Sequence, residues 1–350
     1  MSKSYPRYPN TAPAAVRQAR HEHVTQISMR PSQISDAFSS RIAVAVLAAV
    51  TMGCADGPSE PVDPGSNTPS LIAFAYESSG SRERVGVVRA DGTEQRFVTD
   101  GSVAASMPGW SPDGTELVMS YQGIVGRNPQ LWAIGVNGTG LRAVPIGDHA
   151  GRSPSWSPNG QQLVFDDFHG LFMVKPDGSG FRALLTDEYD NGVPQWSPDG
   201  NWIAFTGFEP GFGEGPSRRL YVVRPDGSGL RRLASSVTRA ILKASWSPDG
   251  SRIVFDVTDE DGRLVGIVTD GDLRIVTVST DVVTTVTNTP ELESRPAWSP
   301  DGTRIAFRRM VGAGSHIFTV RADGTDERQV TSGAGYYDQP AWQPLAVGSH

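Results

Sequence analysis

Short apolar runs recur along the chain from residue 70 onward, and each stands at a fixed distance from a tryptophan. The runs are triplets that begin seven residues after the tryptophan: Leu117-Val118-Met119, Leu163-Val164-Phe165, Ile203-Ala204-Phe205, Ile253-Val254-Phe255 and Ile305-Ala306-Phe307. A constant separation means that one local structure is repeated. Runs that are apolar at every position are typical of strands covered on both faces.

The residues between tryptophan and triplet indicate a tight turn, because proline presets φ early in a turn and glycine accepts a positive φ at its end. The string Trp-Ser-Pro-Asp-Gly occupies Trp110–Gly114, Trp196–Gly200, Trp246–Gly250 and Trp298–Gly302; Trp156–Gly160 carries Asn159 instead of Asp, and Trp342 begins a truncated sixth copy. Successive tryptophans lie 40 to 52 residues apart. They mark six copies of one unit.

A second turn lies inside each interval. Asp-Gly or Asn-Gly pairs between apolar runs begin at Asp91, Asn137, Asp177, Asp226 and Asp323, whereas the fifth unit turns through Asp281. Each unit therefore has four antiparallel strands, and a ring of such sheets covers both faces of each. The sequence predicts an all-β fold: a six-bladed β-propeller of four-stranded antiparallel blades over residues 70–344, with a tail at 345–350.

The two ends of the repeat complement each other. The first triplet, Ile72-Ala73-Phe74, has Gly65 where the tryptophan should stand, and Trp342 at the far end has no triplet after it. We expect the C-terminal strand to pair with the first blade. That pairing would close the ring and remove free sheet edges, which otherwise invite aggregation.

The Trp-Ser-Pro-Asp-Gly repeat resembles the WD-like repeat of the TolB propeller over about residues 70–344. It also resembles the propellers attached to prolyl-oligopeptidase-type hydrolases, but the Gly-x-Ser-x-Gly nucleophile elbow of those enzymes is absent from this sequence. TolB carries an α/β domain before its propeller, where this chain has a short polar segment. The resemblance implies a TolB-like propeller without that domain, serving as a scaffold of the cell envelope.

In such a meander, the repeated first and third turns share one face, and the variable loops share the other. Variable loops on a rigid scaffold commonly carry function. Residues just before each tryptophan should ring the central mouth of that variable face: Asp148, His149, Arg152, Tyr189, Asp190, Asn191, Arg239, Lys243, Glu291, Glu293, Arg295, Tyr336, Tyr337 and Asp338. Aromatic and charged groups together favour a peptide or protein contact; a solvated rim is the competing interpretation.

The repeated side chains themselves are interpreted as structural. One tryptophan per unit at a fixed position is typical of the core between blades. The motif acids Asp113, Asp199, Asp249 and Asp301 should accept hydrogen bonds from their own turns.

The first 53 residues are interpreted as a secretory signal, and residues 54–69 as a flexible tether. The apolar stretch Ile42–Val50 follows Arg41 and ends before Gly53-Cys54, and a start at Met29 gives a signal of ordinary length. Cys54 resembles the lipid-bearing cysteine of bacterial lipoproteins, although Thr51 and Met52 depart from the usual pattern. Ordinary cleavage after Ala55 is the alternative.

The charge balance and the motifs of the chain limit the binding and catalytic functions that the sequence favours. Beyond residue 53 the chain holds 25 basic and 36 acidic residues, which disfavours nucleic-acid binding. A three-histidine metal site (His149, His169, His316), calcium at Asp187–Gly192 or Asp259–Gly262, and paired carboxylates acting on sugars are alternatives without a full motif.

We therefore expect a secreted, lipid-anchored periplasmic or outer-membrane protein, a monomer that binds an envelope protein or peptide without catalysis, cofactor or metal. The alternative is a polysaccharide lyase or hydrolase that works in the central channel.

Overall fold

A computed structural model describes residues 70–123, 128–186, 191–208, 218–258 and 271–345. The predictions for the signal, Cys54, the tether, Tyr189, Asp190, most of the two acidic loops and the tail after residue 345 fall outside these residues. The chain divides into two units, Met1–Val62 and Asp63–His350, and every described residue belongs to the second. All regular elements in the described part are β-strands, in agreement with the repeat.

Four sheets each contain four consecutive antiparallel strands. They are β4 (Ala104–Trp110), β5 (Glu116–Gln122), β6 (Gln130–Gly135) and β7 (Arg142–Val144); β8 (Arg152–Trp156), β9 (Leu163–Asp166), β10 (Leu171–Val174) and β11 (Arg182–Leu185); β12 (Gly192–Trp196), β13 (Ile203–Phe208), β14 (Arg218–Val223) and β15 (Arg231–Leu233); and β16 (Ala244–Trp246), β17 (Arg252–Thr258), β18 (Gly271–Thr277) and β19 (Val283–Thr285).

The remaining strands form one eight-stranded sheet that joins the two ends of the repeat. It contains β20 (Glu293–Trp298), β21 (Arg304–Val311), β22 (Gly314–Arg321), β23 (Arg328–Gln329), β24 (Tyr336–Trp342), β1 (Leu71–Glu77), β2 (Arg84–Arg89) and β3 (Arg96–Phe97). β24 is antiparallel to β1, with Trp342 opposite Ile72. Toward β22, by contrast, β24 makes one parallel bridge, Ser315 to Tyr336.

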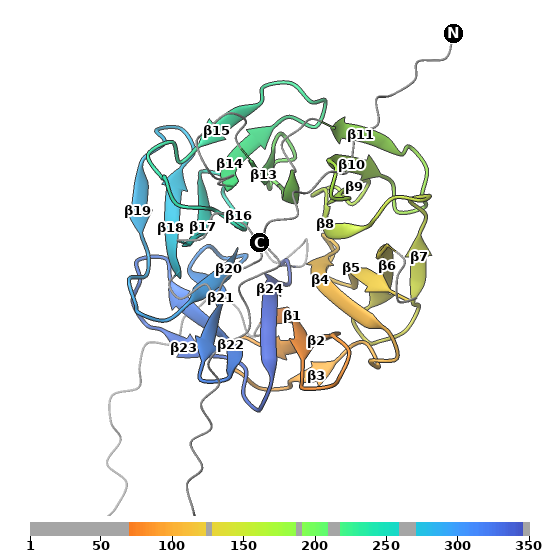
Figure 1. The fold of residues 1–350 in the computed structure, drawn as a ribbon, viewed down its shortest axis with the longest axis horizontal. Coiled ribbons are helices and arrows are strands. Elements are labelled where there is room, and N and C mark those ends of the chain that lie inside the picture. The colour runs from red at the N-terminus through yellow and green to blue at the C-terminus, as the bar shows by residue number, and fades with distance from the viewer. Residues whose placement is uncertain (1–69, 124–127, 187–190, 209–217, 259–270, 346–350) are drawn as a thin grey trace, which may run out of the picture. The chain divides into compact units, whose positions relative to one another are not determined.

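The sheets stand around a common centre, with β4, β8, β16, β20 and β24 nearest to it (Figure 1). Strands that begin and end the repeat lie side by side in this arrangement, as their pairing requires.

The apolar triplets lie in the interior because both faces of each sheet are covered. The third residue of each triplet lies at an equivalent position in its sheet. Its side chain is at most 2% exposed in all six copies, which are Phe74, Met119, Phe165, Phe205, Phe255 and Phe307. Six buried clusters then join each sheet, or half of the eight-stranded sheet, to the next. The core is thus a series of inter-sheet layers.

The motif acids bond their own turns, as the sequence predicts. In the turn after β16, the Ser247 hydroxyl donates to Asp249 Oδ1 at 2.5 Å, and the Ser251 backbone N–H donates to the same oxygen at 3.0 Å. These donors hold the pKa of Asp249 at about 2. Gly250 closes the turn at φ 68°, a conformation that suits glycine.

The repeated turns also contact one another from sheet to sheet. A side chain at Gly200 would meet the Pro158 ring of the preceding turn at 3.3 Å, and one at Gly302 would meet Pro248 at 3.2 Å. The uniform turns therefore form a continuous packed surface on one side of the sheets.

Candidate binding channel

The innermost strands change course three residues before their tryptophans. Five of the six residues at this position have φ between 46° and 60°, although none of them is glycine. Pairing registers shift at the same place in β4, β8, β12 and β20. Such conformations are uncommon, most of all for a β-branched residue such as Val193, and they gather at functional sites.

The six residues at this position face one another across a narrow cavity of about 30 Å³. We call them the constriction ring: Met107, Ser153, Val193, Lys243, Arg295 and Gln339. The cavity has the volume of a single water molecule or a small polar head group. The ring is the narrow level of the central channel, and each sheet contributes a different side chain to it.

Buried polar groups fix the backbone of the ring. Asp256 is 1% exposed; its Oδ1 accepts the backbone N–H of Lys243 at 2.8 Å, and its Oδ2 accepts that of Arg295 at 2.9 Å. On the other side, the Met107 backbone N–H donates to Gln339 Oε1 at 2.6 Å. These bonds hold ring members from neighbouring sheets in register.

The charged groups of the channel are electrostatically perturbed. Enclosure and the nearby Arg295 guanidinium lower the pKa of Lys243 to about 8, against the opposing pull of Asp338 and Asp256. Burial and the Asp338 charge raise the pKa of Glu83 to about 7. In both groups the loss of solvent around the charge is the largest cause of the pKa shift, and neighbouring charges add to it.

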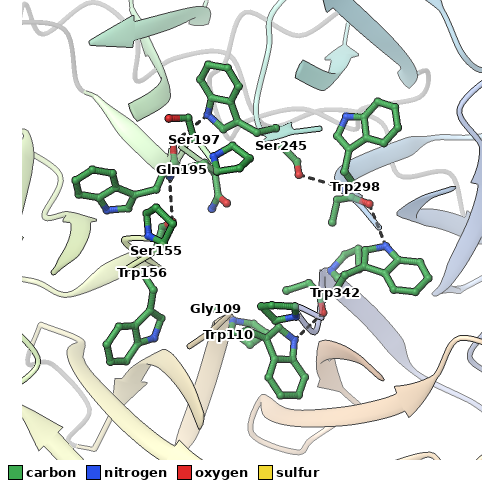
Figure 2. A pocket seen from close by; sticks show the side chains of 18 of the residues that line it. Gly109, Trp110, Ser155, Trp156, Gln195, Ser197, Ser245, Trp298 and Trp342 are labelled. Carbon is green, nitrogen blue, oxygen red and sulfur yellow. Dashed lines mark hydrogen bonds between the residues drawn. The ribbon is translucent and has the colours of Figure 1, made fainter. Parts of the chain in front are cut away.

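Beyond the constriction ring the channel widens to a cavity of about 270 Å³ on the tryptophan side. All six motif tryptophans contribute to its lining, and Lys243 lines both this cavity and the narrow one. In Figure 2 the labelled indoles surround the opening and extend outward between the sheets. Trp110, Trp246 and Trp298 are at most 7% exposed and belong to the inter-sheet clusters, which confirms their structural interpretation.

Hydrogen bonds at the tryptophan level tie neighbouring sheets together, and the residue before each tryptophan selects their type (Figure 2). Where that residue is serine, as at Ser155 and Ser245, its hydroxyl accepts the backbone N–H of the next sheet's tryptophan at 3.1–3.2 Å. Where it is Gln195, Ala297 or Ala341, its carbonyl accepts the indole N–H instead, at 2.9–3.2 Å.

Three of the predicted mouth residues are buried. Asn191, Glu293 and Tyr337 are at most 3% exposed. Glu293 pairs with the Arg309 guanidinium, and the Tyr337 hydroxyl donates to the Ser332 carbonyl at 2.7 Å. The structure therefore places these side chains behind the rim of the mouth.

Others lie nearer the surface in ion pairs. Arg152 is 3.7 Å from Asp166, Arg239 is 3.7 Å from Asp272, and Arg308 is 3.4 Å from Asp338. Tyr336 is 45% exposed. Of the predicted residues, Lys243 and Arg295 are the ones that line the channel cavities among the described residues; a role in binding for any of them stays a prediction.

His149 lies in a separate outer groove of about 570 Å³ together with His169 and Phe181. Its Nδ1 is 2.6 Å from Asp167 Oδ2, and its ring packs on Phe181 at 4.7 Å. His316 is on β22 and stacks on Tyr337 instead. His149 and His169 thus share one groove, whereas His316 lies apart from them, and the described residues include no group of three or more His, Cys, Asp or Glu placed to hold a metal ion.

Sequence reasoning missed Glu83, Asp256 and most of the constriction ring. A signal existed, because the ring residue always stands three positions before the tryptophan and a proline follows it in five of six copies. The residue types at that position differ, and so a search for recurring side chains passed over it. Within the described ranges there is also no helix with the length and apolarity needed to cross a membrane.

No family model matches the sequence. Similar solved structures include TolB from Acinetobacter baumannii (18% identity, 79% of this chain and 67% of that chain covered, TM-score 0.65) and a protein described as TolB from Agrobacterium tumefaciens (18%, 76% and 89%, TM-score 0.59). Hydrazine synthase from Kuenenia stuttgartiensis aligns at 15% identity over 80% of this chain and 47% of that one, with a TM-score of 0.64. The TM-scores show a shared fold: the protein has a TolB-like β-propeller.

Proposed function

We propose that the sheets form six blades and that β24 closes the ring. The eight-stranded sheet divides into β20–β23 and β24 with β1–β3, which a single parallel bridge connects. A buried cluster lies at each of the six junctions that this division creates, the junction between the two halves included. Deletion of residues 338–350 should lower the midpoint of thermal unfolding. An unchanged midpoint would contradict closure.

We further propose that the protein is a non-catalytic scaffold that binds a protein or peptide segment at the mouth of the channel. The observation that supports it most is the constriction ring, whose differing side chains stand on equivalent and rigid backbone positions. Tyr336, which is 45% exposed, and Arg152, whose side chain is 30% exposed, supply aromatic and basic groups of the kind that protein contacts favour. Nothing in the described residues favours the carbohydrate-cleaving alternative.

A photo-reactive amino acid in place of Tyr336 tests this proposal. Irradiation in whole envelopes should produce a discrete cross-linked band, and the added change Arg152→Glu should weaken it, since Arg152 is part of the rim. The same label in place of Val282, which is 56% exposed next to a repeated turn, is the matched control. Equal bands from both positions, or none from Tyr336, would count against binding at the mouth.

An envelope location and a lipid anchor complete the proposal. They rest on the apolar segment before Cys54 and on the TolB-like fold, and they concern residues outside the described ranges. Metabolic labelling with a radioactive fatty acid should mark the protein, and Cys54→Ser should abolish the label. A labelled Cys54→Ser variant, or an unlabelled parent chain, would argue against lipidation at this cysteine.

A further inference from the structure

Two cationic side chains of the constriction ring, those of Lys243 and Arg295, line the same narrow cavity, and within the described residues neither lies in a close ion pair with a carboxylate. Lys243 donates only a long 3.4 Å hydrogen bond to the Pro340 carbonyl. Among the described residues, no hydrogen bond or ion pair to the Arg295 guanidinium is found; only its backbone N–H is engaged. Both residues are partly exposed, and the donors of their side chains that have no protein partner can bind an anion.

The acids around the pair are largely committed elsewhere. Asp256 accepts three backbone N–H groups, from Leu242, Lys243 and Arg295. Asp338 lies against Arg308. The remaining carboxyl is that of Glu83, whose pKa of about 7 leaves a large fraction of it neutral near physiological pH. Two cations thus face a channel in which the negative charge is already engaged or reduced.

The space next to the pair suits a small head group that carries an apolar side chain. The narrow cavity of about 30 Å³ lies between the ring residues. Arg295 also lines a second cavity of about 300 Å³. The carbon-rich part of that second cavity comes from Leu242, Val257, Leu292 and Met310. A group that filled both would place its charge in the ring and its hydrocarbon in the second cavity.

We propose that the constriction ring binds the C-terminal carboxylate of a partner peptide whose last side chain is apolar. The carboxylate lies between the Lys243 ammonium and the Arg295 guanidinium, and the last side chain occupies the cavity lined by Leu292 and Met310. A planar carboxylate matches the two-pronged geometry of a guanidinium. The assignment of this carboxylate to a peptide rests on the proposed function.

Isothermal titration calorimetry at pH 7 with three synthetic peptides tests the inference. The peptide Ala-Ala-Ala-Leu with a free C-terminus should bind; its C-terminal amide and Ala-Ala-Ala-Asp should each bind at least ten-fold more weakly. Lys243→Met and Arg295→Met should each reduce the affinity for the free acid at least ten-fold. Lys175→Met changes an exposed lysine directly after β10 that lines neither channel cavity, and it should leave the affinity unchanged.

Each other result overturns the inference. Equal binding of acid and amide removes the carboxylate from recognition, and equal binding of the Leu and Asp peptides removes the apolar cavity. Binding of acetate or phosphate without binding of the free acid would mean a small-ion site. A thermal unfolding scan confirms that each variant is folded. Failure of the proposed function has a separate signature, the loss of the cross-link from Tyr336.

Discussion

The central channel has two levels that are built from the same six strands and follow opposite rules. At one level stand six tryptophans, followed in five copies by nearly the same turn. Three residues earlier stand six residues of five chemical kinds: a thioether, a hydroxyl, a hydrocarbon, an amide and two cations. The level at which all six residues are tryptophan is the level that holds the sheets together. At the other level the side chains differ although five of the six positions share one backbone conformation, so each position can contribute its own chemistry to the channel.

The largest effect should come from removing a repeated tryptophan. Trp246 is 7% exposed, packs between two sheets and donates its indole N–H to the Gln195 carbonyl. Trp246→Ala should cost about 3–5 kcal/mol of the free energy of unfolding, as large-to-small core changes do. Tyr336→Ala, at an exposed aromatic side chain, should cost less than about 0.5 kcal/mol. Urea unfolding measures both, and similar costs would contradict the structural role of the tryptophan.

A smaller effect is expected in the turns. Asp249→Ala removes the acceptor of the Ser247 hydroxyl and of the Ser251 backbone N–H, and should cost about 1–2 kcal/mol. Asp249→Asn is the matched control, since Asn159 already performs this role in another copy, where its Oδ1 accepts the Ser157 hydroxyl at 2.8 Å. We expect the Asn variant to unfold at nearly the parental urea concentration. Equal losses in both variants would mean that charge, not hydrogen bonding, stabilises the turn.

Two carboxyl groups, Glu83 and Asp249 of a repeated turn, should respond to pH in opposite directions. The pKa of Glu83 is raised to about 7 in the folded protein. Protonated Glu83 therefore stabilises the fold at pH values below the pKa that this carboxyl has in the unfolded chain. This contribution is lost as the pH rises through 7. After allowance for the partial exposure of Glu83 to solvent, the linked change in the free energy of unfolding is about 1–2 kcal/mol. The lowered pKa of Asp249 acts oppositely, because its contribution is lost only as the pH falls through about 2. Glu83→Gln should flatten the dependence of unfolding free energy on pH between 5 and 8; an unchanged slope would contradict the assignment.

The smallest expected effect is a gain. Val193 holds a β-branched side chain at φ 53°. Asparagine tolerates this conformation, so Val193→Asn should raise the unfolding free energy by about 1 kcal/mol. Val282→Asn, at an exposed position with negative φ, should change it little. Loss of stability in the first variant would mean that the contacts of Val193 outweigh its backbone strain.

The sequence predicts the frame well for a physical reason. The Trp-to-triplet spacing, the Asp-Gly turns and the pairing of Ile72 with Trp342 follow from backbone requirements that every copy must satisfy. The channel is harder to predict, because Lys243 and Arg295 meet only after β16 and β20 are placed side by side, and Asp256 reaches them from a third strand. The burial of Glu293 and Tyr337 likewise depends on side chains from other elements. The position of a residue relative to the tryptophan indicates whether it belongs to the constriction ring, whereas its residue type does not.

The pairing of β24 with β1 has a consequence for how the chain acquires its structure. These strands are the last and the first of the described fold, with Trp342 opposite Ile72. Until its final segment is synthesised, a growing chain therefore exposes the free side of β1 and has no partner to cover it. Contacts between such distant segments make folding slow. Assembly of this fold consequently requires β24 to have been synthesised, and any factor that shields β1 in the meantime would act as its chaperone.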